Sequence, residues 1–258
     1  MTALKALLLD MDGVLWRGTQ PIGSVTENLA TIAAKGLKVG FVTNNSTLTV
    51  EQYQEKFRKF GAEVEAKQIY TSANAAAHYL SQQFAAGSRI YVVGETGIQQ
   101  ALETRGFTLA DTDCIAVVAG LDRHLTYDKL RTATQLIAKG AAFIGTNPDR
   151  TLPSPDGPVP GAGSILAAIQ AASGVQPTII GKPGAAGFMA AMDAMGVTPQ
   201  ETLMIGDRVD TDVAGAQAAG CRAGLVLSGI TTEAEAHAWQ PAPDYIAADL
   251  ATLLATLP

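Results

Sequence analysis

Short apolar runs that end in polar residues recur along the chain. The first run covers residues 7–9 and is followed by Asp10, Met11, Asp12 and Gly13. A brief apolar run closed by a turn signal is typical of a buried strand in a parallel sheet. Asp10 would then lie at the carboxyl end of that strand, which is where open α/β sheets bind their ligands.

The same pattern repeats in alternation with segments of helical periodicity. Further strands are predicted at 39–42, 69–72, 89–93, 114–119, 142–145, 178–180, 203–205, 223–227 and 245–246. Helices are predicted between them, at 25–35, 49–60, 74–83, 98–105, 127–139, 164–173, 185–195, 212–219 and 248–254. Pro and Gly crowd residues 151–163, which predicts a long loop. This alternation indicates the α/β class and a doubly wound parallel sheet.

The spacing between polar strand ends indicates an inserted domain. Between Asp12 and Thr43 there is room for one crossover helix and little else. Between Thr43 and Lys182 the chain is far longer than a crossover requires. If these residues share one site, a whole domain stands between them. We therefore predict a core domain of residues 1–79 plus 178–258 and an inserted α/β domain at 80–177.

Composition restricts the classes of partner. The chain has 258 residues, of which 47% are hydrophobic and 16% charged, as in a well-packed globular protein. Its net charge of −6 gives no electrostatic footprint for nucleic acid, and no cluster of Lys and Arg suits a membrane surface. No run approaches the ~18 apolar residues of a membrane helix. The two cysteines, Cys114 and Cys221, lack metal-type spacing. We expect a cytoplasmic protein with no nucleic-acid or membrane partner.

Acidic residues at predicted strand ends suit a metal ion. Asp10 and Asp12 follow the first strand, and Asp207 follows the strand at 203–205, with Asp212 shortly after it. Two acids as close as Asp10 and Asp12 repel each other, so a cation or a shared proton is expected between them. Asp10, Asp12 and Asp207 together suit a hard divalent ion such as Mg²⁺.

Other strand ends suit a phosphate group. Thr43, Asn44 and Asn45 follow a predicted strand and precede a helix, whose N-terminus favours anions. Lys182 adds a compact positive charge for the same anion. Pro183 stands where a phosphate-binding loop of the Walker type requires Ser or Thr, so that interpretation fails.

Four segments carry a specific resemblance to a known family. They are Asp10-Met11-Asp12-Gly13-Val14-Leu15, Val42-Thr43-Asn44-Asn45-Ser46, Gly181-Lys182-Pro183 and Gly206-Asp207-Arg208-Val209-Asp210-Thr211-Asp212. They look like the four motifs of the haloacid dehalogenase-like (HAD) superfamily. The form of the second and fourth segments resembles subfamily IIA, the NagD-like and p-nitrophenylphosphatase-like phosphatases. The likeness spans nearly the whole chain.

This resemblance implies a role for each motif residue. Asp10 is expected to attack phosphorus and form an aspartyl-phosphate, and Asp12 to act as general acid and then base. Mg²⁺ is expected to bind the Asp10 carboxylate, the Asp12 backbone carbonyl and Asp207. Thr43, Asn44, Asn45 and Lys182 would hold the phosphoryl group, and Asp212 would order a metal-bound water or Lys182. The inserted domain would act as a cap that closes over the site and selects the leaving group.

The hypothesis is thus a Mg²⁺-dependent phosphatase acting on a small phosphorylated metabolite. One alternative is a phosphomutase that uses the same aspartyl-phosphate. Another is a receiver-like or binding module that accepts phosphate without turnover. The identity of the phosphate monoester, the role of Arg208 and the oligomeric state stay open, with a homodimer through the cap as one alternative.

Overall fold

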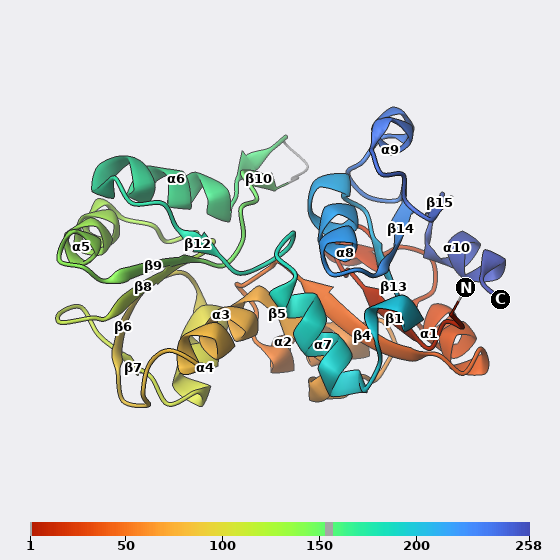
Figure 1. Cartoon of the computed structure of the whole chain (residues 1–258), viewed down its shortest axis with the longest axis horizontal. Helices are drawn as coiled ribbons and strands as arrows, with labels where there is room; N and C mark the ends of the chain where they lie inside the picture. Colours follow the sequence, from red (N-terminus) through yellow and green to blue (C-terminus); the bar gives the residue numbers. More distant parts are fainter. Residues whose placement is uncertain (1, 153–156) are drawn as a thin grey trace. The chain divides into compact units, whose positions relative to one another are not determined.

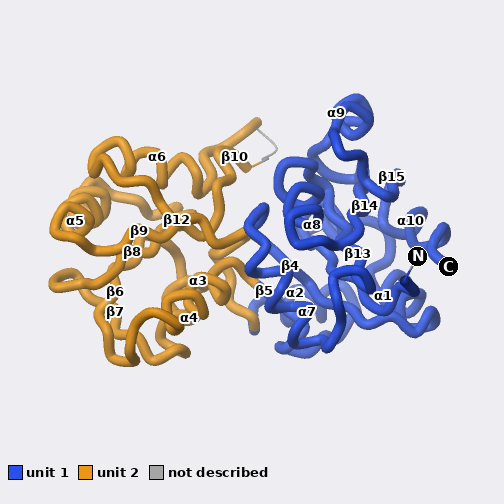
Figure 2. The backbone as a smooth tube through the Cα atoms, viewed as in Figure 1, with its two compact units in different colours: residues 1–43, 51–70, 182–258 blue, residues 44–50, 71–181 orange. Residues whose placement is uncertain are grey.

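The computed structural model describes residues 2–152 and 157–258. The chain divides into two compact units (Figure 2). The first contains residues 1–43, 51–70 and 182–258, and the second contains residues 44–50 and 71–181. The sequence predicts a narrower insertion at 80–177, and its function as a cap stays a prediction.

The first unit is built on a six-stranded sheet (Figure 1). In spatial order its strands are β15 (Tyr245–Ala247), β14 (Arg222–Val226), β13 (Thr202–Gly206), β1 (Ala6–Leu9), β4 (Lys38–Thr43) and β5 (Ile69–Thr71). Counted along the chain, this order is sixth, fifth, fourth, first, second, third, which is the arrangement of a doubly wound dinucleotide-binding sheet. The order reverses between β1 and β13, which pair in parallel. Such a reversal is where open α/β sheets form their ligand crevice.

Helices cover both faces of this sheet. They are α1 (Val25–Ala34), α2 (Val50–Lys59), α7 (Ala186–Met195), α8 (Ala214–Ala218), α9 (Glu233–Ala238) and α10 (Leu250–Thr256). On one face Leu8 and Met204 pack in a buried cluster with Phe188 of α7. On the other face Phe41 contacts Phe57 of α2, with ring centroids 4.6 Å apart. Because both faces are covered, β1 is buried along its whole length, and this explains its uninterrupted apolar run.

The second unit has a parallel sheet of its own. Its spatial order is β12 (Thr178–Ile179), β9 (Ala142–Gly145), β8 (Ala116–Ala119), β6 (Arg89–Val93) and β7 (Thr108–Leu109). One face packs against α3 (Ser72–Ser81) and α4 (Thr96–Thr104), and the other against α5 (Tyr127–Ala138) and α6 (Ala162–Ser173). Each unit therefore has a complete hydrophobic core, as the prediction of two α/β units requires.

Some short elements were not predicted from the sequence pattern. Strands β2 (Trp16–Arg17) and β3 (Gln20–Pro21) form a hairpin directly after the Asp10 loop. The predicted loop at 151–163 contains a second hairpin, β10 (Thr151–Leu152) with β11 (Val159–Pro160), and its residues 153–156 lie outside the described part. Strand β7 and helix α9 were also not predicted. Two-residue strands are too short to show a period, so the pattern does not reveal them.

The fourth-motif helix also differs from its prediction. A helix is predicted from residue 212, but the segment Val209–Val213 is a π-helical turn that leads into α8. Such turns are rare in helices and are frequently found at functional sites. Among the described residues, no helix is long and apolar enough to cross a membrane.

Candidate active site

Three buried carboxylates meet where the strand order of the first unit reverses. Asp10 follows β1, Asp207 follows the neighbouring β13, and Asp212 lies in the π-helical turn after it. One carboxylate oxygen from each lies within 4.8 Å of the others. Adjacent parallel strands end at the same edge of the sheet, which explains how residues 10 and 207 come together.

Lys182 joins two of these carboxylates. Its ammonium nitrogen, Nζ, lies 2.5 Å from Asp10 Oδ1 and 2.6 Å from Asp212 Oδ1. It also donates a hydrogen bond of 3.2 Å to the carbonyl oxygen of Val42, near the end of β4. Lys182, Asp10 and Asp212 are all buried, so these charged hydrogen bonds are shielded from water.

Backbone N–H groups bond one further oxygen each of Asp212 and Asp207. Asp212 Oδ2 accepts hydrogen bonds of 3.1 Å from the backbone N–H groups of Asp207 and Arg208. Asp207 Oδ2 accepts one of 2.8 Å from the backbone N–H of Ile230. Asp212 is thus fully engaged by Lys182 and by the loop that carries Asp207, which suits a residue that positions others.

Glycines make room for the Asp207 carboxylate. Gly13 has a φ of +91°, and a Cβ atom built there would overlap the carboxylate of Asp207. A Cβ at Gly229 would overlap the same side chain. The glycine that directly follows Asp12 therefore has a role beyond turn formation, because it admits an acid from 194 residues further along the chain.

Burial, together with the neighbouring negative charges, raises the pKa values of Asp10 and Asp207. Burial raises the pKa of Asp10 well above its ordinary value, the charge of Lys182 opposes this, and Asp212 and Asp207 add to it. Burial, together with the charge of Asp212, raises the pKa of Asp207 to about 7. Burial alone would lower the pKa of Lys182, but Asp10 and Asp212 outweigh it and raise that pKa. The metal-free cluster thus has a surplus of negative charge that resists full ionisation.

This cluster fits a divalent cation. Three carboxylates and one ammonium leave a formal charge of minus two, which an ion such as Mg²⁺ would neutralise. Carboxylate oxygens are its preferred ligands, and one or two of them suffice. Asp10 and Asp207 are the residues that would hold it, because Asp212 already bonds Lys182 and two backbone N–H groups.

Asp12, two residues after Asp10, has a different environment. Its side chain is 45% exposed. Its Oδ1 accepts a hydrogen bond of 2.9 Å from Trp16 Nε1 and lies 3.6 Å from Lys56 Nζ. Neither Trp16 nor Lys56 was among the residues predicted for the site. Only the tertiary structure brings Lys56, from α2, beside the first motif.

The second motif divides between the units. Thr43 ends β4 and is buried in the first unit. Asn44 and Asn45 follow it in the chain and belong to the second unit. Asn44 Nδ2 donates to Asp149 Oδ2 at 3.3 Å, and Asn45 Oδ1 accepts from the backbone N–H of Thr47 at 3.0 Å. The latter bond is an Asx turn leading toward α2, and contact of these three residues with phosphate stays a prediction.

Arg208 forms a two-point ion pair with its neighbour. Its Nε and Nη2 donate to the two carboxylate oxygens of Asp210 at 3.1 and 3.0 Å. The Asp210 side chain is 59% exposed. The pair lies on the surface of the loop, and Asp210 is outside the carboxylate cluster.

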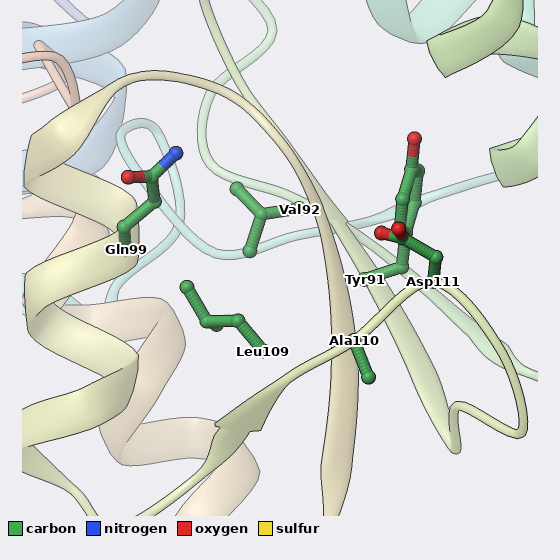
Figure 3. A pocket seen from close by; sticks show the side chains of 6 residues that line it. All are labelled: Tyr91, Val92, Gln99, Leu109, Ala110 and Asp111. Atoms are coloured by element: carbon green, nitrogen blue, oxygen red, sulfur yellow. The ribbon is translucent and has the colours of Figure 1, made fainter.

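The second unit has a pocket that contains none of the predicted site residues (Figure 3). In this pocket Gln99 projects from α4 and Leu109 from β7. Its remaining lining residues are Tyr91, Val92, Ala110 and Asp111. Three of the six lining side chains, those of Tyr91, Gln99 and Asp111, carry polar groups, and among the lining residues Asp111 is the one that is charged.

Comparison with known proteins identifies the family. The family model of haloacid dehalogenase-like hydrolases matches residues 7–108, and a second model, of HAD-like hydrolases, matches residues 179–253. The dihydroxyacetone phosphatase of Corynebacterium glutamicum is 38% identical over 253 residues, which cover 98% of this chain and 92% of the relative.

Solved structures show the same similarity. The p-nitrophenyl phosphatase of Archaeoglobus fulgidus has a TM-score of 0.93 at 29% identity and covers 99% of this chain and 100% of its own. The glycerol phosphate phosphatase of Mycobacterium tuberculosis, solved in complex with magnesium, has a TM-score of 0.91 at 32% identity. This match covers 98% of this chain and 78% of the relative. The sequence motifs, both sheets and the relatives agree: the chain belongs to the haloacid dehalogenase-like hydrolases.

Proposed function

We propose that the protein is a Mg²⁺-dependent phosphatase that hydrolyses a small organic phosphate monoester. The observation that carries this proposal is the buried cluster of Asp10, Asp207, Asp212 and Lys182 at the reversal of the strand order. A cluster with more acids than cations is costly to bury. A bound divalent cation would offset the surplus of negative charge, and the cation and Lys182 could then both interact with the phosphate of a substrate.

Asp10 is the nucleophile in this proposal. A carboxylate oxygen of Asp10 attacks phosphorus, and the bond from phosphorus to the leaving oxygen breaks. This forms an aspartyl-phosphate on Asp10. Lys182, 2.5 Å from Asp10 Oδ1, neutralises charge on the transferring phosphoryl group, and Thr43 provides a further contact at the end of β4.

Asp12 is the proton carrier. Its carboxyl gives a proton to the departing alkoxide, so the alcohol leaves neutral. Its carboxylate then accepts a proton from the water that attacks the aspartyl-phosphate, which regenerates Asp10 and releases phosphate. The 45% exposure of Asp12 suits this task, since it must reach both an alcohol and a water. Mg²⁺, when bound, would supply electrostatic stabilisation for the phosphate oxygens.

The relatives support a small substrate. A dihydroxyacetone phosphatase and a glycerol phosphate phosphatase are both similar along almost the whole of this chain. The substrate class that we propose is therefore a monoester of a small polar alcohol, such as a triose or polyol phosphate. The second unit is proposed to select among such leaving groups.

Phosphate release from a panel of metabolites tests the proposal. Purified protein is incubated with p-nitrophenyl phosphate, polyol phosphates, sugar phosphates and nucleoside monophosphates, with Mg²⁺ or with EDTA. We expect steady release that EDTA abolishes and that Asp10→Asn lowers on the order of 10⁴-fold or more. Asp193→Asn, an exposed position on α7, is the matched control and should retain wild-type turnover.

The same experiment separates the alternatives. A phosphomutase would interconvert two sugar phosphates with little net release, and a receiver-like module would take up one phosphate per chain and stop. Undiminished turnover in EDTA, or turnover retained by Asp10→Asn, would contradict the proposed mechanism.

A further inference from the structure

Two donors from different elements contact the Asp12 carboxylate. The indole nitrogen Nε1 of Trp16 donates to Asp12 Oδ1 at 2.9 Å, and Lys56 Nζ lies 3.6 Å from the same oxygen. Trp16 belongs to β2 of the hairpin that follows the first motif, and Lys56 to α2. Both donors meet one oxygen, Oδ1.

Trp16 cannot easily move away from this position. It is completely buried, and its ring packs edge-on against Phe57, with centroids 5.0 Å apart. The ring of Phe60 also packs against it, with ring centroids 5.5 Å apart. Its backbone carbonyl accepts a 2.7 Å hydrogen bond from the N–H of Gly13, which ties it to the residue beside Asp12. A side chain held in this way directs its N–H in one fixed direction.

Lys56 is held by the same ring. Its ammonium lies 4.2 Å from the centre of the Trp16 ring, within the range of a cation–π interaction. Its side chain is 20% exposed, so its charge is only partly screened by water. Trp16, Lys56 and Asp12 therefore form one cluster in which each side chain contacts the other two.

A general acid needs such support when it is exposed to water. An exposed carboxyl group rotates freely, and a proton donor contributes only when it lies within hydrogen-bond reach of the leaving oxygen. The hydrogen bond from Trp16 and the ion pair with Lys56 hold Oδ1 in place and leave Oδ2 to carry the proton. The competing explanation is that Trp16 is buried for packing alone and that its N–H simply bonds the nearest acceptor.

We propose that Trp16 and Lys56 are positioning residues that hold the Asp12 carboxyl with Oδ2 toward the leaving oxygen. This inference rests on the proposed function, because it concerns the proton that the departing alkoxide receives. It assigns no contact with substrate to either residue. The role can be tested by varying the leaving group. An alkoxide must receive a proton as it departs, whereas p-nitrophenolate can depart without one, so loss of a positioning residue should slow the alkyl ester more than the aryl ester.

The main variant is Trp16→Phe, which keeps an aromatic ring against Phe57 and removes the N–H. We measure kcat/KM, which reports the steps up to transfer of the phosphoryl group to Asp10, for the best alkyl phosphate of the panel and for p-nitrophenyl phosphate. We expect kcat/KM for the alkyl ester to fall about 10- to 100-fold. This is part of the ~10²–10⁴-fold rate enhancement that a positioned general acid contributes. The aryl ester should lose less than about threefold.

The chain offers a matched control. Trp239 is the other tryptophan, and its Nε1 donates to Gln217 Oε1 at 3.3 Å. Trp239→Phe removes an indole N–H elsewhere in the same unit and should leave both substrates unaffected. Equal losses of kcat/KM for both esters in Trp16→Phe, or no loss for either, would overturn the proposal.

Lys56→Met gives a second route that leaves the buried ring untouched. We expect kcat/KM for the alkyl ester to fall about three- to tenfold in Lys56→Met and kcat/KM for the aryl ester to fall less. Lys59→Met, at an exposed position on the same helix, should leave kcat/KM for both esters unchanged. Equal effects of Lys56→Met on the two esters would likewise overturn the proposal. A wild-type protein that releases phosphate from neither ester would overturn the proposed function as well, whereas an active wild type with equal losses in the variants overturns the positioning role alone.

Discussion

Both units are built on a parallel sheet, but they differ in how acids and cations are paired at the ends of their strands. Each places acidic residues after parallel strands. In the second unit two of these acids have cations of their own: Asp122 bonds Lys129 at 2.6 Å, and Glu95 bonds Arg123 at 3.1 Å. In the first unit Asp10 and Asp212 share the single cation Lys182, with Asp207 close by.

This difference separates what the fold needs from what the chemistry needs. At Asp122 and Glu95 the second unit balances an acid after a strand with a cation, so a sheet of this type folds without a surplus of negative charge at these strand ends. The surplus of buried negative charge in the first unit therefore contributes nothing to folding and costs stability until a cation binds. Substitutions that act on the surplus should affect activity and metal binding, while those on the balanced pairs should affect stability alone.

The largest effect is expected from Lys182→Met. It removes the shared cation, so the buried carboxylates of Asp10 and Asp212 lose their ammonium partner, and turnover should fall at least about 10³-fold. Breaking a buried pair costs about 3–5 kcal/mol, so the metal-free variant should unfold much more readily than wild type in a urea titration at pH 8. Mg²⁺ should restore part of that stability. Wild-type stability without metal would contradict the comparison.

The next effect concerns pH in the absence of metal. Asp10 and Asp207 have raised pKa values, about 7 for Asp207, so the folded state holds protons that the unfolded state has already lost. Stability from these groups is present at low pH and is lost as pH rises through the folded-state pKa. From Asp207 alone we expect metal-free protein to be less stable at pH 8 than at pH 6 by about 1 kcal/mol, and Asp10 acts in the same direction.

Mg²⁺ sharpens that pH prediction, because metal binding releases the protons held by its ligands. Added Mg²⁺ should raise Tm more at pH 8 than at pH 6, measured by thermal unfolding in Mg²⁺ and in EDTA. Asp207→Asn should remove most of this difference, while Asp210→Asn, in the same loop, should preserve it. An equal Mg²⁺ shift at both pH values would contradict the assignment.

A smaller effect is expected from Gly13→Ala. The new Cβ would push the Asp207 carboxylate from its place, so Mg²⁺ affinity should fall about 10- to 100-fold, the range seen when ligand-orienting groups are disturbed. Gly18→Ala is the control, since Gly18 also has a positive φ, +57°, but its Cβ meets nothing within 4 Å. Calorimetric titration with Mg²⁺ measures both. Equal losses of affinity in the two variants would mean that backbone strain alone is responsible.

The smallest effect is expected in the second unit. Asp122→Asn weakens a balanced pair with Lys129 and should cost about 1–3 kcal/mol of stability. The Mg²⁺ affinity of the variant should equal that of wild type in the same titration. A change in that affinity would show that the second unit shares in the metal site and would break the comparison.

Much of the fold follows from local patterns. The buried run that becomes β1 and the Asp-x-Asp-Gly turn are visible in the sequence, because a strand covered on both faces must be apolar throughout. The fold class and the family follow from the same segments. The two hairpins do not, since strands of two residues have no measurable period.

The site could be predicted only in part. Asp10 and Asp207 follow adjacent strands of one sheet, and Asp212 comes shortly after Asp207, so the topology predicts that these three acids lie near one another. Lys182 follows β12, a strand of the second unit's sheet, so its contact with Asp10 does not follow from the strand order of the first sheet. Lys56 has no such signal, because on an amphipathic helix a lysine beside Phe57 indicates only a solvated edge. Its contact with Trp16 and Asp12 depends on how α2 packs against the rest of the unit, and the local sequence pattern does not predict that packing.

The strand order has a consequence for synthesis on the ribosome. The strand β1 is central in its sheet and needs β13, which the ribosome adds almost 200 residues later. Until residues 202–206 emerge, a growing chain keeps one edge of its most apolar strand open, although the whole second unit can already fold. Unpaired strand edges are templates for aggregation. Premature termination within or after the second unit would therefore yield a product that is half folded and prone to self-association, which makes completion of the C-terminal quarter a requirement for solubility as well as for catalysis.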